Sequence, residues 1–158
     1  MRSTLLPIVL ITLFVASAAH AQTFKVDPQH SSIVFKSKHI DTSYVFGRFN
    51  EFGGTVTVDA DPTKMAFDIT AKTESIDTGN AKRDTHLKSP DFFSAKEFPN
   101  ISFKSTSVKS AGENKYEVAG DLTLHGVTKP ITVTIEKVGQ SNNPQFAGQC
   151  INRTADIK

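Results

Sequence analysis

The sequence predicts an all-β fold, either an antiparallel sandwich or a barrel, with one short helical insertion around residues 80–95. Apolar and polar residues alternate with period two over several segments, which is typical of strands with one wet and one buried face. Many strands of similar length joined by short turns indicate a sandwich or a barrel. A charged block between Ser75 and Pro99 interrupts this pattern and carries residues that cap helices.

The alternating segments follow one another along most of the chain. They cover residues 32–39, 55–59, 65–72, 101–104, 116–124 and 131–136. Turn-forming residues separate them, among them Asp61-Pro62, His125-Gly126 and Ser141-Asn142-Asn143-Pro144. The pair Gly53-Gly54 lies inside a strand pattern. Such glycines usually mark a bulge or a sharp bend, which a closing barrel needs at its corners.

The charged block is predicted to form a helix over residues 81–88, with Asn80 as the N-cap. Three of its residues stand at positions i, i+3 and i+4 and therefore share one face: Arg83, His86 and Leu87. Ser89-Pro90 ends this helix and begins a second short turn, which carries Phe92 and Phe93. We expect the insertion to cover the mouth of an apolar cavity.

The first 21 residues have the features of a secretory signal peptide. Arg2 supplies a positive charge, residues 5–15 form a short apolar run, and Ala19-His20-Ala21 fits a cleavage site. The apolar run is too short to span a bilayer stably. We therefore expect cleavage after Ala21, a single mature domain over residues 22–158, and a location in the bacterial periplasm.

The composition argues against two classes of protein. Without Arg2 the chain has 17 basic and 16 acidic residues, so it lacks the basic surplus that displaces counterions from nucleic acid. Cys150 is the single cysteine, so an internal disulfide framework is excluded. The stability of an exported domain of this kind must therefore come from its hydrophobic core.

A series of short motifs runs in a fixed order along the predicted mature chain. They are Val26-Asp27-Pro28-Gln29-His30-Ser31, Gly47-Arg48-Phe49, Phe52-Gly53-Gly54, Ser75-Ile76-Asp77-Thr78-Gly79, Arg83-Asp84, His86-Leu87, Asp91-Phe92-Phe93, Phe98-Pro99 and Gly120-Asp121-Leu122-Thr123-Leu124-His125-Gly126-Val127-Thr128. In order and spacing they resemble the YceI-like family of polyisoprenoid-binding periplasmic proteins. The resemblance implies a lipocalin-like antiparallel β-barrel that holds a long-chain isoprenoid-type or other amphiphilic lipid. It implies no catalytic residues and no cofactor.

The lipid site is expected on the apolar face of the strands and on the two phenylalanines of the insertion. Its candidate lining is Phe35, Phe67, Ile69, Phe92, Phe93, Phe103, Tyr116, Val118, Leu122, Leu124 and Val133. Phe92 and Phe93 would either line a lipid tunnel or fill a core. Arg83 and His86 would bind an anionic head group, because a guanidinium matches phosphate geometry. Alternatively, Arg83 pairs with a carboxylate such as Asp77 and holds the loop.

Two other function classes stay open. The barrel would have a plain packed core in a stress or interaction module, or the histidines would serve an enzyme. The histidines of the predicted mature chain are His30, His39, His86 and His125. No pair of them has the spacing of a zinc motif, and the chain has no Gly-x-Ser-x-Gly elbow. The sequence therefore predicts neither a metal site nor a hydrolase triad.

The end of the sequence departs from the family pattern. Members usually carry an Asn-Arg step followed by Asp-Phe-Gly and a further strand or two, whereas here Asn152-Arg153 is followed by residues 154–158. We expect the barrel to lack its closing strand and to leave open edges near Ser32 and around residues 131–135. An open edge is a surface on which two chains would pair as a dimer, although the sequence itself sets no oligomeric state.

The cleavage site generates a direct prediction. Protein recovered from the periplasmic fraction should begin at Gln22, because signal peptidase cuts after the small residue of an A-x-A motif. N-terminal sequencing of the exported protein checks this. A chain that still begins at Met1 would contradict the signal-peptide interpretation.

Overall fold

The computed structural model describes residues 21–140 and 150–153. The predicted signal peptide, apart from Ala21, and residues 154–158 lie outside these ranges. So does the turn expected at residues 141–144.

Ten strands of the described chain form two antiparallel sheets. The larger sheet has the order β1-β4-β5-β7-β8-β9-β10. Its strands are β1 (Gln22–Lys25), β4 (Phe52–Val58), β5 (Ala66–Lys72), β7 (Asn100–Gly112), β8 (Lys115–Leu124), β9 (Val127–Gln140) and β10 (Cys150–Arg153). The smaller sheet has the order β2-β3-β6, with β2 at Ile33–His39, β3 at Ser43–Phe49 and β6 at Ile76–Asp77.

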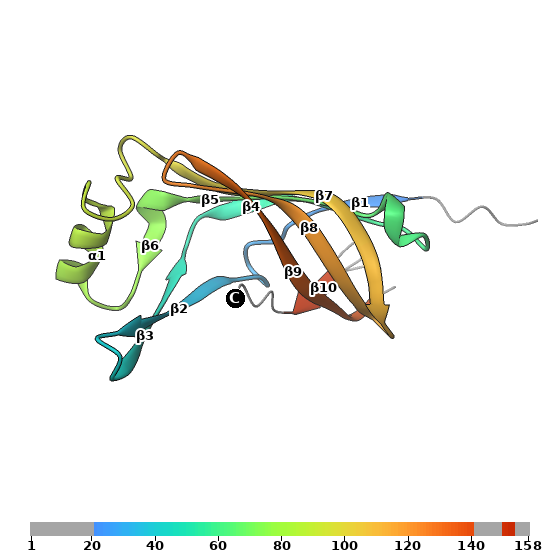
Figure 1. The fold of residues 1–158 in the computed structure, drawn as a ribbon, viewed down its shortest axis with the longest axis horizontal. Helices are drawn as coiled ribbons and strands as arrows, with labels where there is room; N and C mark the ends of the chain where they lie inside the picture. Colours follow the sequence, from blue (N-terminus) through green and yellow to red (C-terminus); the bar gives the residue numbers. More distant parts are fainter. Residues whose placement is uncertain (1–20, 141–149, 154–158) are drawn as a thin grey trace, which may run out of the picture.

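The larger sheet curls into a half-barrel, and the smaller sheet continues from one end of it (Figure 1). Helix α1 (Ala81–Lys88) lies at the same end as the β2–β3 hairpin. Two 3₁₀ turns, η1 (Pro62–Lys64) and η2 (Thr73–Ser75), flank β5. The all-β class and the single helical insertion are therefore confirmed.

Two local predictions need correction. Gly53-Gly54 causes no register shift between β4 and β5; instead Gly54 has a φ of 140°, and a Cβ there would lie 2.0 Å from the carbonyl oxygen of Asp68. Only glycine permits this backbone conformation together with so close an approach. The bulge lies in β7, where the register with β8 shifts between Ser105 and Ser107. That bulge also explains why β7 continues far beyond the predicted segment 101–104.

The edges expected to be open lack a strand partner in the described part of the chain. Strand β2 pairs only with β3 there. Strand β10 pairs with the end of β9, from Glu136 to Gln140, and leaves the outer edge of residues 127–135 without a neighbour among residues 21–140 and 150–153.

The core consists of two clusters inside the curl. One contains Met65, Phe67, Val108, Val118 and Val133. The other lies nearer α1 and contains Phe49, Ala71 and Ile76, with Phe35, Leu87 and Phe93 packed against it. The helix insertion therefore contributes to the second cluster through Leu87 and Phe93.

Two aromatic rings of the inner surface lie directly over glycines. A Cβ added to Gly47 would meet the Phe35 ring at 2.3 Å, and one added to Gly120 would meet the Phe103 ring at 2.6 Å. Each glycine therefore leaves the space that its neighbouring ring occupies.

The buried position of Val118 generates a stability prediction. Val118 is 1% exposed, whereas Val127, on the neighbouring strand, is 54% exposed. Val118→Ala should lower the free energy of unfolding by about 2–3 kcal/mol, because it removes two buried methyl groups and leaves a cavity. Val127→Ala should change it by less than about 0.5 kcal/mol. Urea unfolding measures both, and equal losses would contradict the assignment of the core.

Candidate functional site

The strand pairing brings the predicted lining residues onto one face of the curled sheets. In an antiparallel ladder, directly paired residues project to the same side. Pairing joins Ile69 to Phe103 and Phe103 to Leu122, and it joins Val118 to Val133. Phe35, Phe67, Tyr116 and Leu124 occupy inner-face positions in the same phase. The inner face is therefore continuous and predominantly apolar.

A middle section of this inner face lies between the two core clusters. Ile69 and Leu122 belong to neither cluster and are half-buried. Leu124 is 36% exposed. Apolar surface is thus accessible on the inner side of the curl, in a row that crosses β5, β7 and β8.

One cation stands at the end of that row. Lys129 on β9 pairs with Leu122 and therefore occupies an inner-face position, where it is exposed. The sequence reasoning missed it because Lys129 precedes a proline and lies outside the predicted alternating segment 131–136.

Helix α1 is fastened to the strand before it by side-chain hydrogen bonds. The Asn80 side chain accepts a bond from the backbone N–H of Arg83, as the capping prediction required. The Arg83 guanidinium donates to the Thr78 hydroxyl at 2.7 Å and to the Thr78 carbonyl at 2.8 Å. The Asp84 carboxylate accepts from the Thr78 backbone N–H at 2.9 Å and from its hydroxyl. Thr78 is therefore the anchor of the helix.

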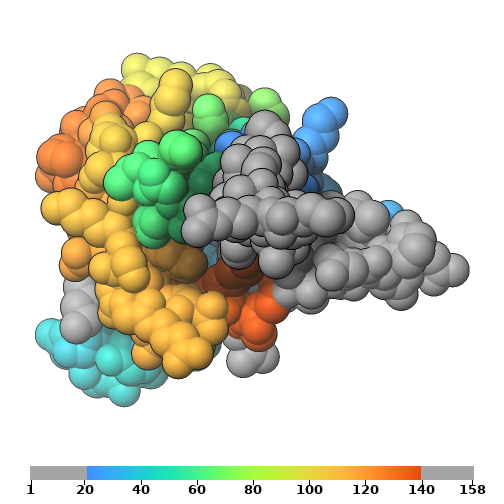
Figure 2. All heavy atoms as spheres, turned by 90° about the vertical axis from the view of Figure 1, so that its right-hand side faces the viewer, coloured from blue at the N-terminus to red at the C-terminus, as the bar shows by residue number. Residues whose placement is uncertain are grey.

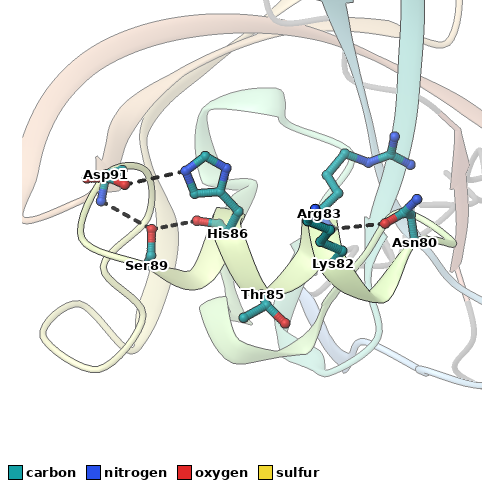
Figure 3. A pocket seen from close by; sticks show the side chains of 7 residues that line it. All are labelled: Asn80, Lys82, Arg83, Thr85, His86, Ser89 and Asp91. Carbon is teal, nitrogen blue, oxygen red and sulfur yellow. Dashed lines mark hydrogen bonds and ion pairs between the residues drawn. The ribbon is translucent and has the colours of Figure 1, made fainter.

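Arg83 and His86 share a helix but reach different partners. His86 Nε2 lies 3.4 Å from the Asp91 carboxylate, and its ring packs edge-on against Phe92 at 4.8 Å. Figure 3 shows His86 directed toward Asp91, while the Arg83 side chain extends elsewhere. An open depression on this surface is lined by Asn80, Lys82, Arg83, Thr85, His86, Ser89 and Asp91. The head-group role of Arg83 and His86 stays a prediction.

The two adjacent phenylalanines have different surroundings. Phe93 is half-buried and lies edge-on to Phe49, with 6.2 Å between ring centroids. Phe92 is 50% exposed and contacts His86 instead. The structure therefore brings Phe93, but not Phe92, together with the inner face.

The carboxylate of Asp77 has a different arginine from the one that the sequence suggested. Arg48 Nη2 lies 3.5 Å from Asp77 Oδ2, and the Asn50 amide donates to the same oxygen at 3.3 Å. The Gly79 backbone N–H donates to Asp77 Oδ1 at 2.8 Å. The Gly79 N–H, followed by the Asn50 amide and then Arg48, holds the pKa of Asp77 below its ordinary value.

The histidines are placed apart from one another. His30 Nδ1 lies 2.6 Å from the Asp27 carboxylate; hydrogen bonds from His30 and from the Gln29 N–H lower the pKa of Asp27. His125 packs against the Phe98 ring at 4.6 Å. Within residues 21–140 and 150–153, no three His, Cys, Asp or Glu side chains are grouped so that they could hold a metal ion. In the same ranges no helix is long and apolar enough to cross a membrane.

Other inner-face residues were missed for identifiable reasons. Val108 is 2% exposed, but the bulge between Ser105 and Ser107 changes the phase of alternation before it. The signal that would have found Thr78 and Asp84 is an Asp-Thr-Gly turn directly before a capped helix.

This architecture defines a class of protein: a curled antiparallel β half-barrel with an apolar inner face and one helical insertion at its end. The profile of the YceI-like domain matches residues 24–158, and the chain belongs to that family. The resemblance inferred from the motifs is thereby confirmed.

Curated relatives support the membership. A UPF0312 protein of Pseudomonas paraeruginosa is 42% identical over 135 residues, which cover 84% of this chain and 70% of the relative. The protein YceI of Escherichia coli is 39% identical over 148 residues, covering 91% and 77% of the two chains.

Solved structures agree on the fold. BcnA of Burkholderia cenocepacia matches with a TM-score of 0.69 at 27% identity, over 73% of each chain. The YceI protein of Campylobacter jejuni matches with a TM-score of 0.60 at 32% identity, over 76% of this chain and 71% of that one.

The contacts of Asp77 generate a pH prediction. Because its pKa is lowered in the folded state, the carboxylate stabilises the fold at neutral pH, and this contribution is lost as the pH falls below about 4. Asp77→Asn should therefore flatten the acid side of the stability profile between about pH 5 and pH 2. Asp68→Asn, which removes an exposed carboxylate of β5, controls for the loss of one negative charge. Thermal unfolding across that range would contradict the prediction if the Asp77→Asn profile matched the wild-type one.

Proposed function

We propose that this protein is a non-catalytic periplasmic carrier that binds a long-chain isoprenoid-type or other amphiphilic lipid against the inner face of its half-barrel. The observation that carries the proposal is the continuous apolar inner face, of which the section around Ile69 and Leu122 lies outside both packed clusters. Aliphatic and aromatic side chains at that section match a hydrocarbon chain and offer little that would position a reacting group.

The size of the hydrophobic term supports a stable complex. Burying one isoprene unit contributes roughly 3–4 kcal/mol, at about 0.8 kcal/mol per carbon. Ordering of the chain and loss of translational freedom offset much of this sum, so several units are needed for tight binding. A lipid acquired during expression should therefore remain bound through purification.

The head group would lie at the end of the molecule that carries α1. Arg83 and His86 both line the depression there. Two of the five guanidinium donors of Arg83 are directed at Thr78, so Arg83 would present the remaining ones to a phosphate. His86 would contribute a second donor on the side of Asp91.

The lipid prediction is tested by extracting the purified protein with organic solvent and recording a mass spectrum. We expect a chain lipid in the wild-type extract. Leu122→Asn should remove it, because the amide places an unpaired polar group on the apolar row. Asp121→Asn introduces the same residue one position away on the outer face and should retain the lipid.

The controls separate the possible outcomes. Circular dichroism melts show whether Leu122→Asn folds, which is expected since Leu122 belongs to neither buried cluster. A folded Leu122→Asn protein with unchanged lipid would show that the assigned lining is wrong. An empty wild-type extract would favour an interaction module with a packed core, and an enzymatic turnover that depends on a histidine would contradict the non-catalytic assignment.

A further inference from the structure

The β2–β3 hairpin has an outer face that combines apolar side chains with cations. Its inner positions, such as Phe35 and Phe49, contribute to the core cluster near α1. The opposite positions form three directly paired couples: Val34 with Arg48, Lys36 with Phe46, and Lys38 with Tyr44. We call these six residues the hairpin outer face. Each couple joins one apolar or aromatic side chain to one cation, and none of the six is acidic.

The apolar members of this face are unusually exposed. Val34 is 68% exposed, Phe46 66% and Tyr44 55%. Together with Ile40 at the hairpin tip, they make up four of the eight large hydrophobic residues that are exposed in the described part of the chain. Scattered apolar residues on a surface need no explanation, but a group of them beside one another marks an interaction site.

The tip of the hairpin has an unfavourable turn sequence. Ile40 and Asp41 have φ angles of 46° and 55°, and the Thr42 N–H bonds to the His39 carbonyl at 3.0 Å. This is the backbone of a type I′ turn, for which Asn-Gly is the preferred sequence. A β-branched residue at positive φ is strained. The chain nevertheless places Ile40 there, 78% exposed, so that an apolar side chain projects from the extreme end of the hairpin.

The charges on this surface are predominantly positive. Lys38 pairs with Asp41 at 2.8 Å, and Arg48 lies 3.5 Å from Asp77. Lys36 lies 4.7 Å from the centre of the Tyr44 ring, a cation–π contact. The three cations surround the exposed apolar side chains, whereas both carboxylates lie outside the hairpin outer face.

The hairpin also stands clear of the rest of the molecule. Figure 1 shows it projecting from the end that carries α1. In the end-on view its cyan atoms form a lobe that stays visible beyond the nearer strands (Figure 2). A flat surface can therefore approach the tip and the outer face without meeting the half-barrel first.

We propose that the hairpin outer face, with Ile40 at its tip, docks on the surface of an anionic lipid bilayer. Tyr and Lys are suited to the bilayer interface because each has an apolar body and a polar end. Ile40, Phe46 and Val34 enter the boundary of the hydrocarbon, while Lys36, Lys38 and Arg48 lie at the level of the phosphates. Docking of this kind turns the end of the molecule bearing α1 toward the membrane.

Protection of a strand edge and pairing with a second copy of the chain both account for this surface less well. Lysines on an edge strand discourage pairing with another chain, but that accounts for Lys36 and Lys38 and not for the exposed side chains opposite them. A second copy of the chain, related by a two-fold axis, would bring the three cations of each face against one another. An anionic surface satisfies both the charge and the apolar exposure.

The proposal is tested by flotation of the purified protein with vesicles of phosphatidylglycerol and phosphatidylcholine, compared with vesicles of phosphatidylcholine alone. These vesicles contain no isoprenoid, so the result is independent of the proposed cargo. We expect the wild-type protein to float only with the anionic vesicles and to be released as the salt concentration rises. Ile40→Ser and Phe46→Ser should each weaken binding about tenfold, and Lys36→Gln about fivefold.

Matched controls lie elsewhere on the same sheets. Val138 is 58% exposed and Lys109 is exposed on β7, so Val138→Ser and Lys109→Gln should bind as the wild type does. Equal binding to both vesicle types, or equal losses in the controls, would overturn the proposal. So would sedimentation of a dimer that Phe46→Ser dissociates, with no vesicle binding, because the occupant would then be a second copy. Lys36→Gln leaves the turn and the core untouched and keeps the test decisive if Ile40→Ser alters the hairpin.

Discussion

The rest of the structure depends on the pleat of the β-strand, which sends neighbouring side chains to opposite faces of a sheet. Once the large sheet curls, one of these faces becomes the inside and the other the outside. Phe67, Ile69 and Ala71 on β5 are then committed to the interior, and Asp68 and Lys72 to the solvent. The same phase is carried from strand to strand by the ladder, so a single register decides the chemistry of the entire inner face.

The inner face is not filled evenly, and glycines help to determine where it is filled. Gly47 and Gly120 accommodate the rings of Phe35 and Phe103. The two core clusters stabilise the ends of the curl, while the row through Ile69 and Leu122 between them remains half-buried. A protein whose interior served stability alone would gain from closing that row, since each half-exposed leucine forgoes part of its burial energy.

How far the sequence predicts this structure varies from element to element. Strands β2, β5 and β8 were predictable because one of their faces is wet, which makes the alternation visible. Helix α1 was predictable from Asn80 and Ser89-Pro90, because capping is a local interaction. Strand β3 was not, since Tyr44, Val45 and Phe46 are apolar on both faces. That irregularity is the trace of the hairpin outer face.

The candidate site was less predictable than the fold. The inner-face positions follow from periodicity, so most of the lining could be named in advance. Side-chain partners depend instead on where loops return in space. Arg83 reaches Thr78, and Arg48 rather than Arg83 reaches Asp77, across a contact between β3 and β6 that no local pattern encodes. Val108 was missed because the bulge in β7 is invisible in a pattern of Ser and Thr residues.

The pairing of β1 with β4 has a consequence for the order of folding. Strands β7, β8 and β9 are joined by short turns at Glu113-Asn114 and His125-Gly126, so their loops close quickly. Strand β1 meets β4 only across the whole β2–β3 hairpin, with Gln22 opposite Val58. Closing so long a loop costs more entropy, and non-local pairing of this kind is slow. The β7–β9 meander therefore forms early and the first strand joins late. Until it does, β4 is an unprotected edge, and the chain is most vulnerable to aggregation during that interval.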